Sequence, residues 1–304
     1  MKIIVLGANG QLGMSLKKIF QKTSYKFYFF NKSEMNINDH IKLNKKFISI
    51  KPDVIINCSA YTAVDKAEKN FEEANNVNNI SVGFLSQKCL DYDCFLIHIS
   101  TDYVFDGFSE NPYKEDDKKN PIGVYGKTKL DGENRILDSG CKFCIIRTSW
   151  IFSEFGNNFL KTILKLASQN DEVQVVSDQI GAPTYSDDIS RVIATILPFI
   201  ENKIISNEIF HYSGKFFCSW YEFAKIIIKI ANEENMLKKT PFLKSILTSE
   251  YPTLAKRPLN SSLSSEKICA RFNIEASDWK RGIKQSLKCL KKKTTKIKKI
   301  CGNF

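Results

Sequence analysis

The sequence predicts an α/β protein built on a Rossmann-type, doubly wound parallel sheet with a smaller α-rich lobe. Three observations predict this fold. Strand and helix signals alternate through the first half of the chain, a glycine-rich turn follows the first strand, and the alternation gives way to mostly helical signals after Trp150. Strand–helix alternation favours right-handed crossovers and therefore a parallel sheet.

In the first half, short runs of β-branched and aromatic residues have the length and composition of strands. They are Lys2–Leu6, Phe27–Phe30, Asp53–Asn57, Cys94–Ile99 and Phe143–Arg147. Between them, apolar residues recur at helical spacing. These predicted helices are Gln11–Gln21, Ile41–Ile50, Asn78–Leu90 and Val124–Leu137.

The second half contains one short strand signal, Val173–Val176, and a Pro-containing loop, Tyr251–Pro258. Its predicted helices are Phe159–Ala167, Ser190–Ile200, Trp220–Ala231, Ser265–Ala270 and Trp279–Leu290. Ser219 and Glu222 have the spacing of a capping box at the start of the third of these helices. We expect residues 1–150 to form a nucleotide-binding domain and residues 151–290 mainly the second lobe, with some segments returning to the first domain. Residues 291–304 form a basic tail.

Composition excludes several classes of protein. The chain has 304 residues, of which 43% are hydrophobic and 26% charged, as is ordinary for a globular protein. No run approaches the ~18 apolar residues of a membrane-spanning helix, and the apolar start is too short for a secretory signal. The nine cysteines are odd in number and scattered, which together with the missing signal indicates a reducing cytoplasm. Cys141 and Cys144 form a single C-x-x-C, interpreted as buried strand residues, with a redox pair as the alternative.

The net charge of +12 comes mostly from the C-terminal end, which has no acidic residue after Asp278. We interpret this end as a solvated, frayed C-terminus, with an anionic nucleic acid or membrane surface as the alternative partner. The rest of the chain carries no nucleic-acid-binding motif, and we expect neither a nucleic-acid partner nor membrane insertion. The three histidines are not at metal-ligand spacing, so we expect no metal site from the residues.

The turn after the first strand has the spacing G-x-x-G-x-x-G, from Gly7 through Gly10 to Gly13. In dinucleotide-binding proteins, such glycines permit a tight turn, close approach to a pyrophosphate and close packing of helix on strand. We expect the N–H groups of Gly10, Gln11 and Leu12 to face the anion, aided by the helix dipole.

The second strand ends in Asn31 and Lys32, where an NAD site usually has an acidic residue for the ribose 2′-hydroxyl. Without that carboxylate a 2′-phosphate is tolerated, and Lys32 could pair with it. Both NADH and NADPH therefore remain candidate cofactors.

Tyr125 and Lys129 form a Y-x-x-x-K pair on one face of a predicted helix. A phenol with its ordinary pKa near ~10 is a poor acid at neutral pH, and a nearby ammonium is expected to lower that pKa. Thr101 follows the strand ending at Ile99, where ligands bind in open α/β sheets. Its hydroxyl could orient Tyr125 and bond a substrate carbonyl. The pattern predicts proton donation to an oxygen whose carbon receives hydride.

The chain resembles the extended short-chain dehydrogenase/reductases and, within them, the dTDP-4-dehydrorhamnose reductases. The resemblance extends to about Leu290. The motifs that carry it are Gly7–Gly13, Asn57–Glu68, Ser100–Phe105, Tyr125–Glu133, Arg147–Trp150, Gly156–Phe159, Val176–Thr184 and Arg257–Ser261.

The resemblance implies reduction of dTDP-4-dehydro-L-rhamnose to dTDP-L-rhamnose, the last step of dTDP-rhamnose biosynthesis, which supplies cell-surface polysaccharides such as O-antigen. It implies Tyr125 as proton donor, Lys129 as the residue that holds the nicotinamide ribose and Thr101 as the partner of the acid. Further cofactor contacts are implied for Asn31, Asn36, Ile37, Ala60, Tyr61 and Thr62. Thr101, Asp102 and Trp150 would contact the sugar or its nucleotide. The resemblance also implies that the protein is a homodimer. It is the only reason to consider Mg²⁺ as a further cofactor.

Some features leave alternatives open. Family members often carry Asp where Asn31 stands, which leaves the choice between NADH and NADPH open. Arg257 could clamp the substrate diphosphate or form a salt bridge within its lobe. The alternative functions are a nucleotide-sugar epimerase or dehydratase of the same superfamily and a non-catalytic, NADP-binding regulatory subunit. The intact set of Thr101, Tyr125 and Lys129 favours a catalyst.

Overall fold

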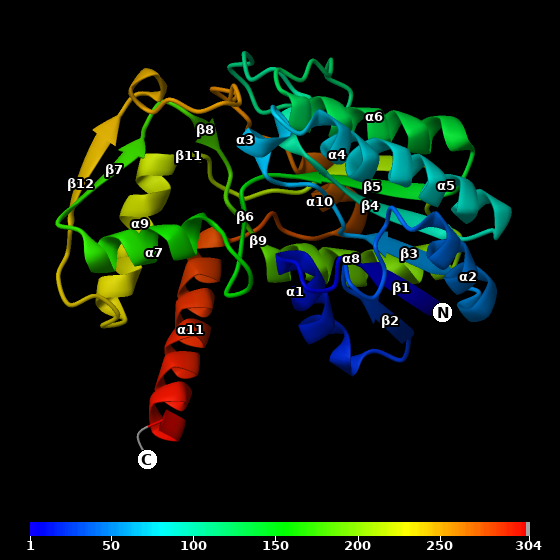
Figure 1. Cartoon of the computed structure of the whole chain (residues 1–304), viewed down its shortest axis with the longest axis horizontal. Coiled ribbons are helices and arrows are strands. Elements are labelled where there is room, and N and C mark those ends of the chain that lie inside the picture. The colour runs from blue at the N-terminus through cyan, green and yellow to red at the C-terminus, as the bar shows by residue number, and fades with distance from the viewer. Residues whose placement is uncertain (302–304) are drawn as a thin grey trace.

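A parallel six-stranded sheet forms the centre of the structure (Figure 1). The structure is a computed structural model that describes residues 1–301, with side chains described for all of these except residues 22 and 293–301. The strand order is β10-β5-β4-β3-β1-β2. The strands are β1 (Lys2–Leu6), β2 (Lys26–Phe30), β3 (Val54–Asn57), β4 (Phe95–Thr101), β5 (Phe143–Thr148) and β10 (Glu208–His211). The order reverses between β1 and β3, which is where such sheets bind ligands.

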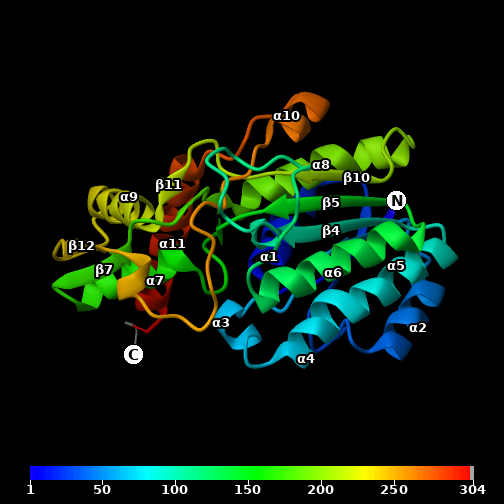
Figure 2. The same ribbon diagram turned by 90° about the horizontal axis from the view of Figure 1, so that it is seen from above.

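Helices cover both faces of this sheet, so the predicted doubly wound α/β fold is confirmed (Figures 1 and 2). On one face lie α1 (Gln11–Ile19), α8 (Ser186–Glu201) and α10 (Glu266–Phe272). On the other lie α2 (His40–Ile50), α5 (Ser81–Asp91) and α6 (Val124–Ser139). Short helical segments connect these elements. They are η1 (Phe20–Lys22), α3 (Val64–Ala67), α4 (Phe71–Asn75), the π-helical η2 (Asn76–Ile80) and the 3₁₀ segments η3 (Asp102–Val104) and η4 (Thr248–Glu250).

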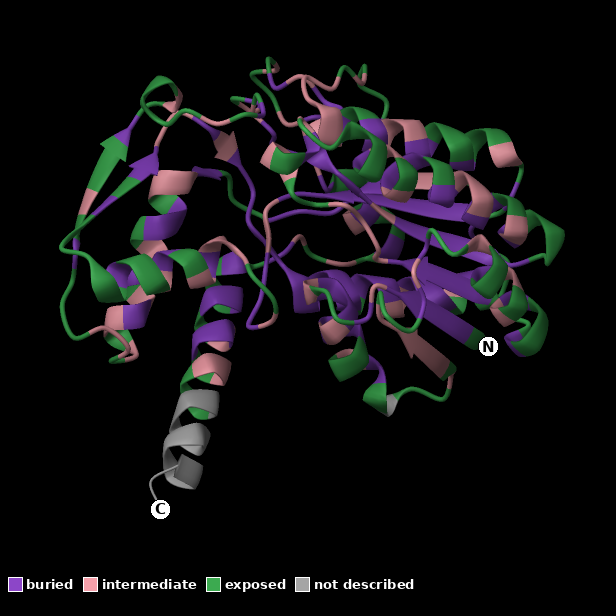
Figure 3. Ribbon diagram, viewed as in Figure 1, coloured by how far each residue is buried: buried purple, intermediate pink, exposed green. Residues whose placement is uncertain are grey.

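Side-chain alternation along the strands divides the core into two layers. Ile3 and Val5 of β1 pack with α1 and α8, whereas Ile4 and Leu6 pack with α2 and α5. Successive side chains of a strand point to opposite faces, and both faces of a parallel sheet are covered, which explains the uninterrupted apolar run. Figure 3 shows the inner strands β1, β3, β4 and β5 as mostly buried and the edge strand β2 as mainly intermediate, with the helices exposed on their outer sides.

The second lobe lies beside the carboxyl ends of the central strands (Figures 1 and 2). Its helices are α7 (Phe159–Gln169), α9 (Trp220–Glu233) and α11 (Trp279–Cys301). Its strands pair as β6 (Ile151–Phe152) with β9 (Thr184–Tyr185), β7 (Glu172–Val176) with β12 (Phe242–Ile246), and β8 (Ile180–Gly181) with β11 (Cys218–Ser219). The predicted capping box is confirmed, because the Ser219 hydroxyl accepts from the Glu222 N–H and the Glu222 side chain accepts from the Ser219 N–H.

Several boundaries differ from those predicted. The helix α8 spans Ser186–Glu201, so it begins four residues before the predicted Ser190 and contains Pro198 in its last turn. The helix α11 continues to Cys301, so the region predicted as a tail from residue 291 is helical in backbone to residue 301, and residues 302–304 lie outside the described part of the chain. The strand β10 returns from the second half to the edge of the central sheet.

Two other sequence interpretations can be checked. Cys141 and Cys144 are free and buried. Cys144 lies within β5, as predicted, whereas Cys141 precedes this strand and is not a strand residue. Among the described residues, every helix is too short or too polar to cross a lipid bilayer.

Candidate active site

A cavity of about 540 Å³ lies between the carboxyl ends of the central strands and the second lobe. Its lining combines segments that are far apart in the sequence. The glycine turn, the end of β4, one face of α6, Trp150 and Trp220 all contribute. The cavity therefore brings the glycine turn together with Thr101, Tyr125 and Lys129, the residues predicted to be catalytic.

The glycine turn forms one wall of this cavity. Gly7 has a φ of 78°, and a Cβ on it would lie 2.9 Å from the Cys58 backbone. A Cβ on Gly13 would collide with the Gly7 carbonyl oxygen. Glycine is therefore required at both positions. The Gly10 N–H donates to the Gly7 oxygen at 3.0 Å and closes the turn, so the expectation that it faces an anion is not met. Gln11 and Leu12, at the start of α1, still bring their N–H groups to the cavity wall.

The other predicted cofactor residues divide between the cavity wall and positions outside it. Ala60 and Thr62 line the cavity, whereas Tyr61 does not. Asn31 also lies outside the cavity. Its Oδ1 accepts from the Ser33 N–H at 2.9 Å and stabilises the turn that contains both residues. Asn36 likewise lies outside and accepts from the Asn38 N–H at 3.1 Å. Ile37 is 4% exposed and packs in the core beneath α2.

Thr101 and Asp102 lie where β4 ends and the 3₁₀ segment η3 begins. The Thr101 hydroxyl accepts from the Tyr103 N–H at 3.2 Å and donates to Asp102 Oδ1 at 2.9 Å. Asp102 is 2% exposed, and burial raises its pKa to about 6 against the lowering effect of hydrogen bonds from Ser261 and Thr101. Its Oδ2 has no hydrogen-bond partner among the described residues. A buried oxygen without a partner is costly in free energy, and a bound ligand could satisfy it.

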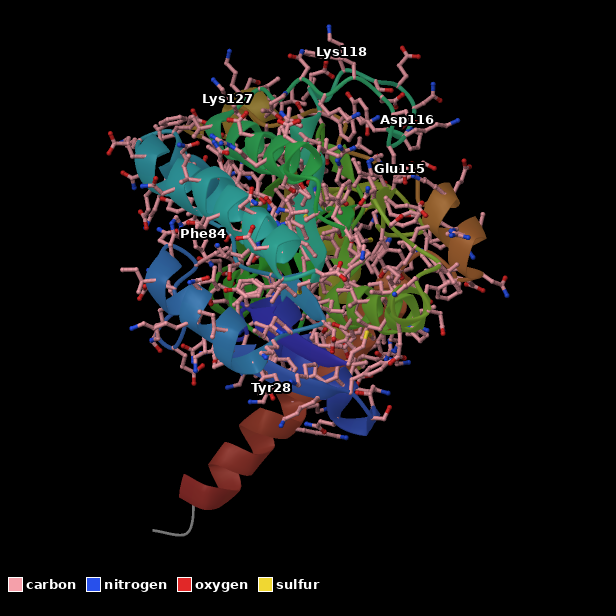
Figure 4. The ribbon with its side chains drawn as sticks, turned by 90° about the vertical axis from the view of Figure 1, so that its right-hand side faces the viewer. Tyr28, Phe84, Glu115, Asp116, Lys118 and Lys127 are labelled. Carbon is pink, nitrogen blue, oxygen red and sulfur yellow. The ribbon has the colours of Figure 1, made fainter. Side chains whose placement is uncertain are left out.

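Tyr125 and Lys129 face the cavity from α6, while Lys127 between them points to solvent (Figure 4). Gly126 explains how the helix comes so close to η3, because a Cβ there would collide with the Tyr103 carbonyl oxygen. This close packing brings the Tyr125 phenol near the Thr101 hydroxyl, and both residues line the cavity. The predicted grouping of Thr101, Tyr125 and Lys129 in one site agrees with this geometry.

The predicted effect of Lys129 on Tyr125 is wrong in this structure. Burial raises the pKa of Tyr125 to about 12, and the Asp102 carboxylate adds to the increase. Burial lowers the pKa of Lys129 to about 8. The Lys129 ammonium group lies 2.7 Å from the Ile99 carbonyl oxygen and 3.1 Å from His98 Nε2, so it is directed toward β4. The phenol is therefore undissociated at neutral pH.

A buried ion pair fixes α6 against the sheet behind these residues. Arg147 of β5 donates to Glu133 of α6 through Nη2 at 2.7 Å, and both side chains are 1% exposed. Ser100 donates a hydrogen bond to the same carboxylate. His211 of β10 lies 3.2 Å from Arg147 Nη1. Buried charges of this kind need such partners, and the network links three strands to the helix that carries Tyr125.

Aromatic residues form the wall opposite the sheet. The Trp150 ring stacks on Trp220 with centroids 3.4 Å apart. Trp150 has a φ of 44°, which is uncommon for a non-glycine residue, and its ring fills the space beside Gly181. Trp220 was missed by the sequence analysis, because its position at the start of α9 indicates only a helix.

Arg257 also reaches the cavity from the loop before α10. Its Nη2 donates to Asp65 Oδ2 at 2.8 Å. Asp65 belongs to α3, so this salt bridge joins the second lobe to the first half of the chain. The predicted alternative, a salt bridge within the lobe of Arg257, is therefore wrong. The Arg257 Nε is buried and has no hydrogen-bond partner among the described residues.

The sequence predicted a role for the Gln11 N–H group but not for the Gln11 side chain. Gln11 donates to the Ile151 oxygen at 3.2 Å and accepts from Ser153 and Asn158, so it joins the glycine turn to the loop that follows β6.

No group of three or more His, Cys, Asp or Glu residues within the described part of the chain could hold a metal ion.

Comparison with known proteins gives a consistent result. A family model described as "RmlD substrate binding domain" matches residues 1–292. A dTDP-4-dehydrorhamnose reductase from Aggregatibacter actinomycetemcomitans is 42% identical over 285 residues, covering 93% of this chain and 97% of the relative. The crystal structure of a dTDP-4-dehydrorhamnose reductase from Clostridium acetobutylicum is 35% identical with a TM-score of 0.87, and covers 96% of this chain and 100% of the other. That of the Bacillus anthracis enzyme in complex with NADP is 33% identical with a TM-score of 0.86, covering 94% and 98%.

Proposed function

Because the chain belongs to the dTDP-4-dehydrorhamnose reductase family, we propose that it converts dTDP-4-dehydro-L-rhamnose to dTDP-L-rhamnose with Tyr125 as the proton donor. The protein is an NAD(P)H-dependent oxidoreductase of dTDP-rhamnose biosynthesis. The observation that carries the proposal is the convergence of Thr101, Tyr125 and Lys129 on a cavity that also contains the glycine turn.

The glycine turn fits a dinucleotide. Gly7 and Gly13 have no room for a Cβ, and α1 starts at the cavity wall, where its dipole and its first N–H groups favour a pyrophosphate. When bound, NAD(P)H supplies a hydride to the ketone carbon. Gln11 and Leu12 would hold the pyrophosphate, and Ala60 and Thr62 would line the rest of the cofactor site. Asn31 presents no carboxylate to a ribose 2′-phosphate, which supports use of NADPH as well as NADH.

Tyr125 would supply the proton. The phenol is protonated at neutral pH, which is the form that a reductase requires at this position, and burial makes it a weaker acid than an ordinary phenol. As negative charge develops on the substrate oxygen, the phenol hydrogen bonds to it and donates its proton. Thr101 donates its one hydroxyl proton to Asp102 in the free protein, and this hydroxyl would have to turn toward Tyr125 to stabilise the phenolate that results.

The remaining lining residues would hold the nucleotide sugar. Asp102 Oδ2, which lacks a partner, is available to accept a hydrogen bond from a sugar hydroxyl. The stacked Trp150 and Trp220 rings offer a flat apolar surface to the sugar or the base. Arg257 is available for the diphosphate, since its guanidinium suits phosphate oxygens. Binding energy from the nucleotide would then position the ketone for the reaction.

We extend the proposal to the setting of the enzyme. Residues 1–150, together with α8, β10 and α10, would form the cofactor-binding part, and the other segments of 151–290 the substrate-binding lobe. Family resemblance supports a homodimer, and the free described cysteines support a reducing cytoplasm. We assign no step to Mg²⁺.

The direct test is to mix the purified protein with dTDP-4-dehydro-L-rhamnose and either NADH or NADPH and to follow absorbance at 340 nm. We expect substrate-dependent loss of the reduced cofactor. No loss with either cofactor would contradict the proposal and favour a non-catalytic relative. A cofactor that co-purifies stoichiometrically would instead favour an epimerase or dehydratase.

We predict that Tyr125→Phe lowers kcat by roughly 10²-fold or more, because positioned acid catalysis contributes about that much. Cofactor affinity, measured by fluorescence titration with NADPH, should change little. An unchanged kcat would mean that another group donates the proton.

A further inference from the structure

The start of α6, the helix that carries Tyr125, is held by a residue from a distant part of the sequence. Glu68, which directly follows α3, accepts a hydrogen bond from the Val124 N–H through Oε1 at 2.9 Å. Both ribbon views show α3 beside the start of α6 (Figures 1 and 2). The steps above have assigned no role to Glu68.

The first turn of α6 has no cap from its own end of the chain. Its N-cap residue is Gly123, which has no side chain, and the first N–H groups of a helix have no partner within the helix. A carboxylate at this end also interacts favourably with the helix dipole. A Cβ on Gly123 would lie 2.9 Å from Glu68 Oε1. Glycine at this position therefore leaves the carboxylate of Glu68 room to reach the helix.

A second contact joins the same two parts of the chain on the other side of Tyr125. Asn78 Oδ1 accepts from the Tyr61 N–H at 2.8 Å, and Asn78 Nδ2 donates to the Thr128 hydroxyl at 3.2 Å. The segment that contains Tyr61 and Glu68 is therefore bound to α6 both before and after Tyr125.

This segment also forms part of the cavity wall. Ala60, Thr62 and Val64 line the cavity from one side, and Tyr125 lines it from α6. In the proposed function, the first wall contacts the cofactor and Tyr125 donates the proton. The placement of the phenol relative to the reacting carbon therefore depends on how this segment is fixed to α6. A displacement of ~1 Å between reacting groups can lower a rate by about 10²-fold.

We propose that Glu68 is a positioning residue, which fixes Tyr125 relative to the cofactor side of the cavity by holding the first N–H group of α6. This role rests on the proposed function, because it requires Tyr125 to be the proton donor. Glu68 itself does not line the cavity. Its removal should therefore slow the reaction and leave the binding of cofactor and sugar nearly unchanged.

Two substitutions of Glu68 separate the hydrogen bond from the rest of the side chain. We expect Glu68→Ala to lower kcat about tenfold or more, with KM for the dTDP-sugar and for NADPH changed less than about threefold. Glu68→Gln keeps an oxygen that can accept from the Val124 N–H, so its kcat should stay within about threefold of the parent value. An unchanged kcat in Glu68→Ala, or equal losses in the two variants, would overturn the proposal.

Asp278→Ala is the matched control. Asp278 Oδ1 accepts from the Arg281 N–H at 3.1 Å at the start of α11, and neither residue lines the cavity. The control thus removes the same kind of bond, between a carboxylate and the first turn of a helix. Each Ala variant should lower the unfolding temperature by a few degrees, because a lost cap destabilises a helix. Only Glu68→Ala should lower kcat, and an equal decrease in kcat in both would overturn the proposal.

Amide hydrogen exchange in the free protein gives a measurement that does not depend on turnover. We expect NMR to show a protected Val124 N–H in the parent and in Glu68→Gln, and exchange about tenfold faster or more in Glu68→Ala. Equal exchange of this N–H in the parent and in Glu68→Ala would overturn the proposal. A parent without turnover in the 340 nm assay would contradict the proposed function instead, whereas an active parent with an equally active Glu68→Ala variant would overturn only the role of Glu68.

Discussion

At the scale of single residues, Asp102 places stability and binding in opposition. Its buried carboxyl has a pKa of about 6, compared with 3.8 in the unfolded chain. Because folding raises this pKa, the folded chain binds the proton more tightly, and stability falls as pH rises from about 4 through 6. The site therefore keeps a carboxylate that weakens the folded state above pH 6.

We predict that Asp102→Asn raises the free energy of unfolding by roughly 3 kcal/mol at pH 8 and by about half as much at pH 5. Urea unfolding of both proteins at the two pH values measures the difference. The same variant should lower kcat/KM, because the NH₂ group of an asparagine donates hydrogen bonds and cannot accept the one that Asp102 Oδ2 would accept from the sugar. An equal gain in stability at both pH values would show that the carboxylate charge is not its source.

The residues of the site differ in how far the sequence could reveal them. Thr101, Tyr125 and Lys129 lie in motifs whose spacing fixes their position on a strand end and a helix face. Trp220 and His98 lack such a signal, because their partners are separated from them by dozens of positions in the sequence. The pKa of Tyr125 was predicted in the wrong direction because burial, which spacing does not reveal, outweighs a neighbouring lysine that is turned toward β4.

At the scale of elements, the site depends on how closely α6 packs on η3. Gly126 is the contact point, and its lack of a side chain leaves room for the Tyr103 carbonyl oxygen. We predict that Gly126→Ala displaces the start of α6, destabilises the protein by roughly 1–3 kcal/mol and lowers kcat at least tenfold. Thermal unfolding and steady-state kinetics give the two values.

Gly83→Ala is the control for adding a methyl group to a helix. Gly83 lies in α5, and the atoms nearest to a Cβ there belong to the exposed Arg135 side chain, at 3.2–3.4 Å, which is far less close than the contact at Gly126. Alanine also favours helix over glycine by about 1 kcal/mol, so this variant should be at least as stable as the parent. Similar losses of activity in both variants would mean that the contact with η3 is not critical.

The predicted elements were most accurate where one face of a helix or strand is apolar along its whole length. Strands β1 to β5 of the central sheet and the helices that cover them fall in this group. The sequence missed β12, whose residues are mostly exposed at the edge of a two-stranded sheet, and β10, which is only four residues long. The end of α11 was missed because its lysines resemble a solvated tail, and helix periodicity alone does not reveal where such a segment stops.

At the scale of the whole molecule, the cavity exists only because the second lobe is held against the carboxyl ends of the strands. The Arg257–Asp65 salt bridge spans the two parts, and its side chains are 26% and 40% exposed. Such a partly exposed pair adds little to stability, about 0–1 kcal/mol. Its placement at the cavity wall, with Nε unpaired, fits a role in binding better than a role in stability.

We predict that Arg257→Gln raises KM for the dTDP-sugar about tenfold, because a charge-assisted hydrogen bond to phosphate contributes roughly 1.5–3 kcal/mol. The KM for NADPH and the unfolding temperature should change little, since the salt bridge itself is weak. Arg191→Gln is the control, because Arg191 pairs with buried Asp188 away from the cavity and is itself 48% exposed. If both variants raised KM for the sugar equally, the guanidinium of Arg257 would not contact the substrate diphosphate. If Arg257→Gln changed KM for NADPH alone, this arginine would belong to the cofactor site, and the two lobes would divide cofactor and substrate differently.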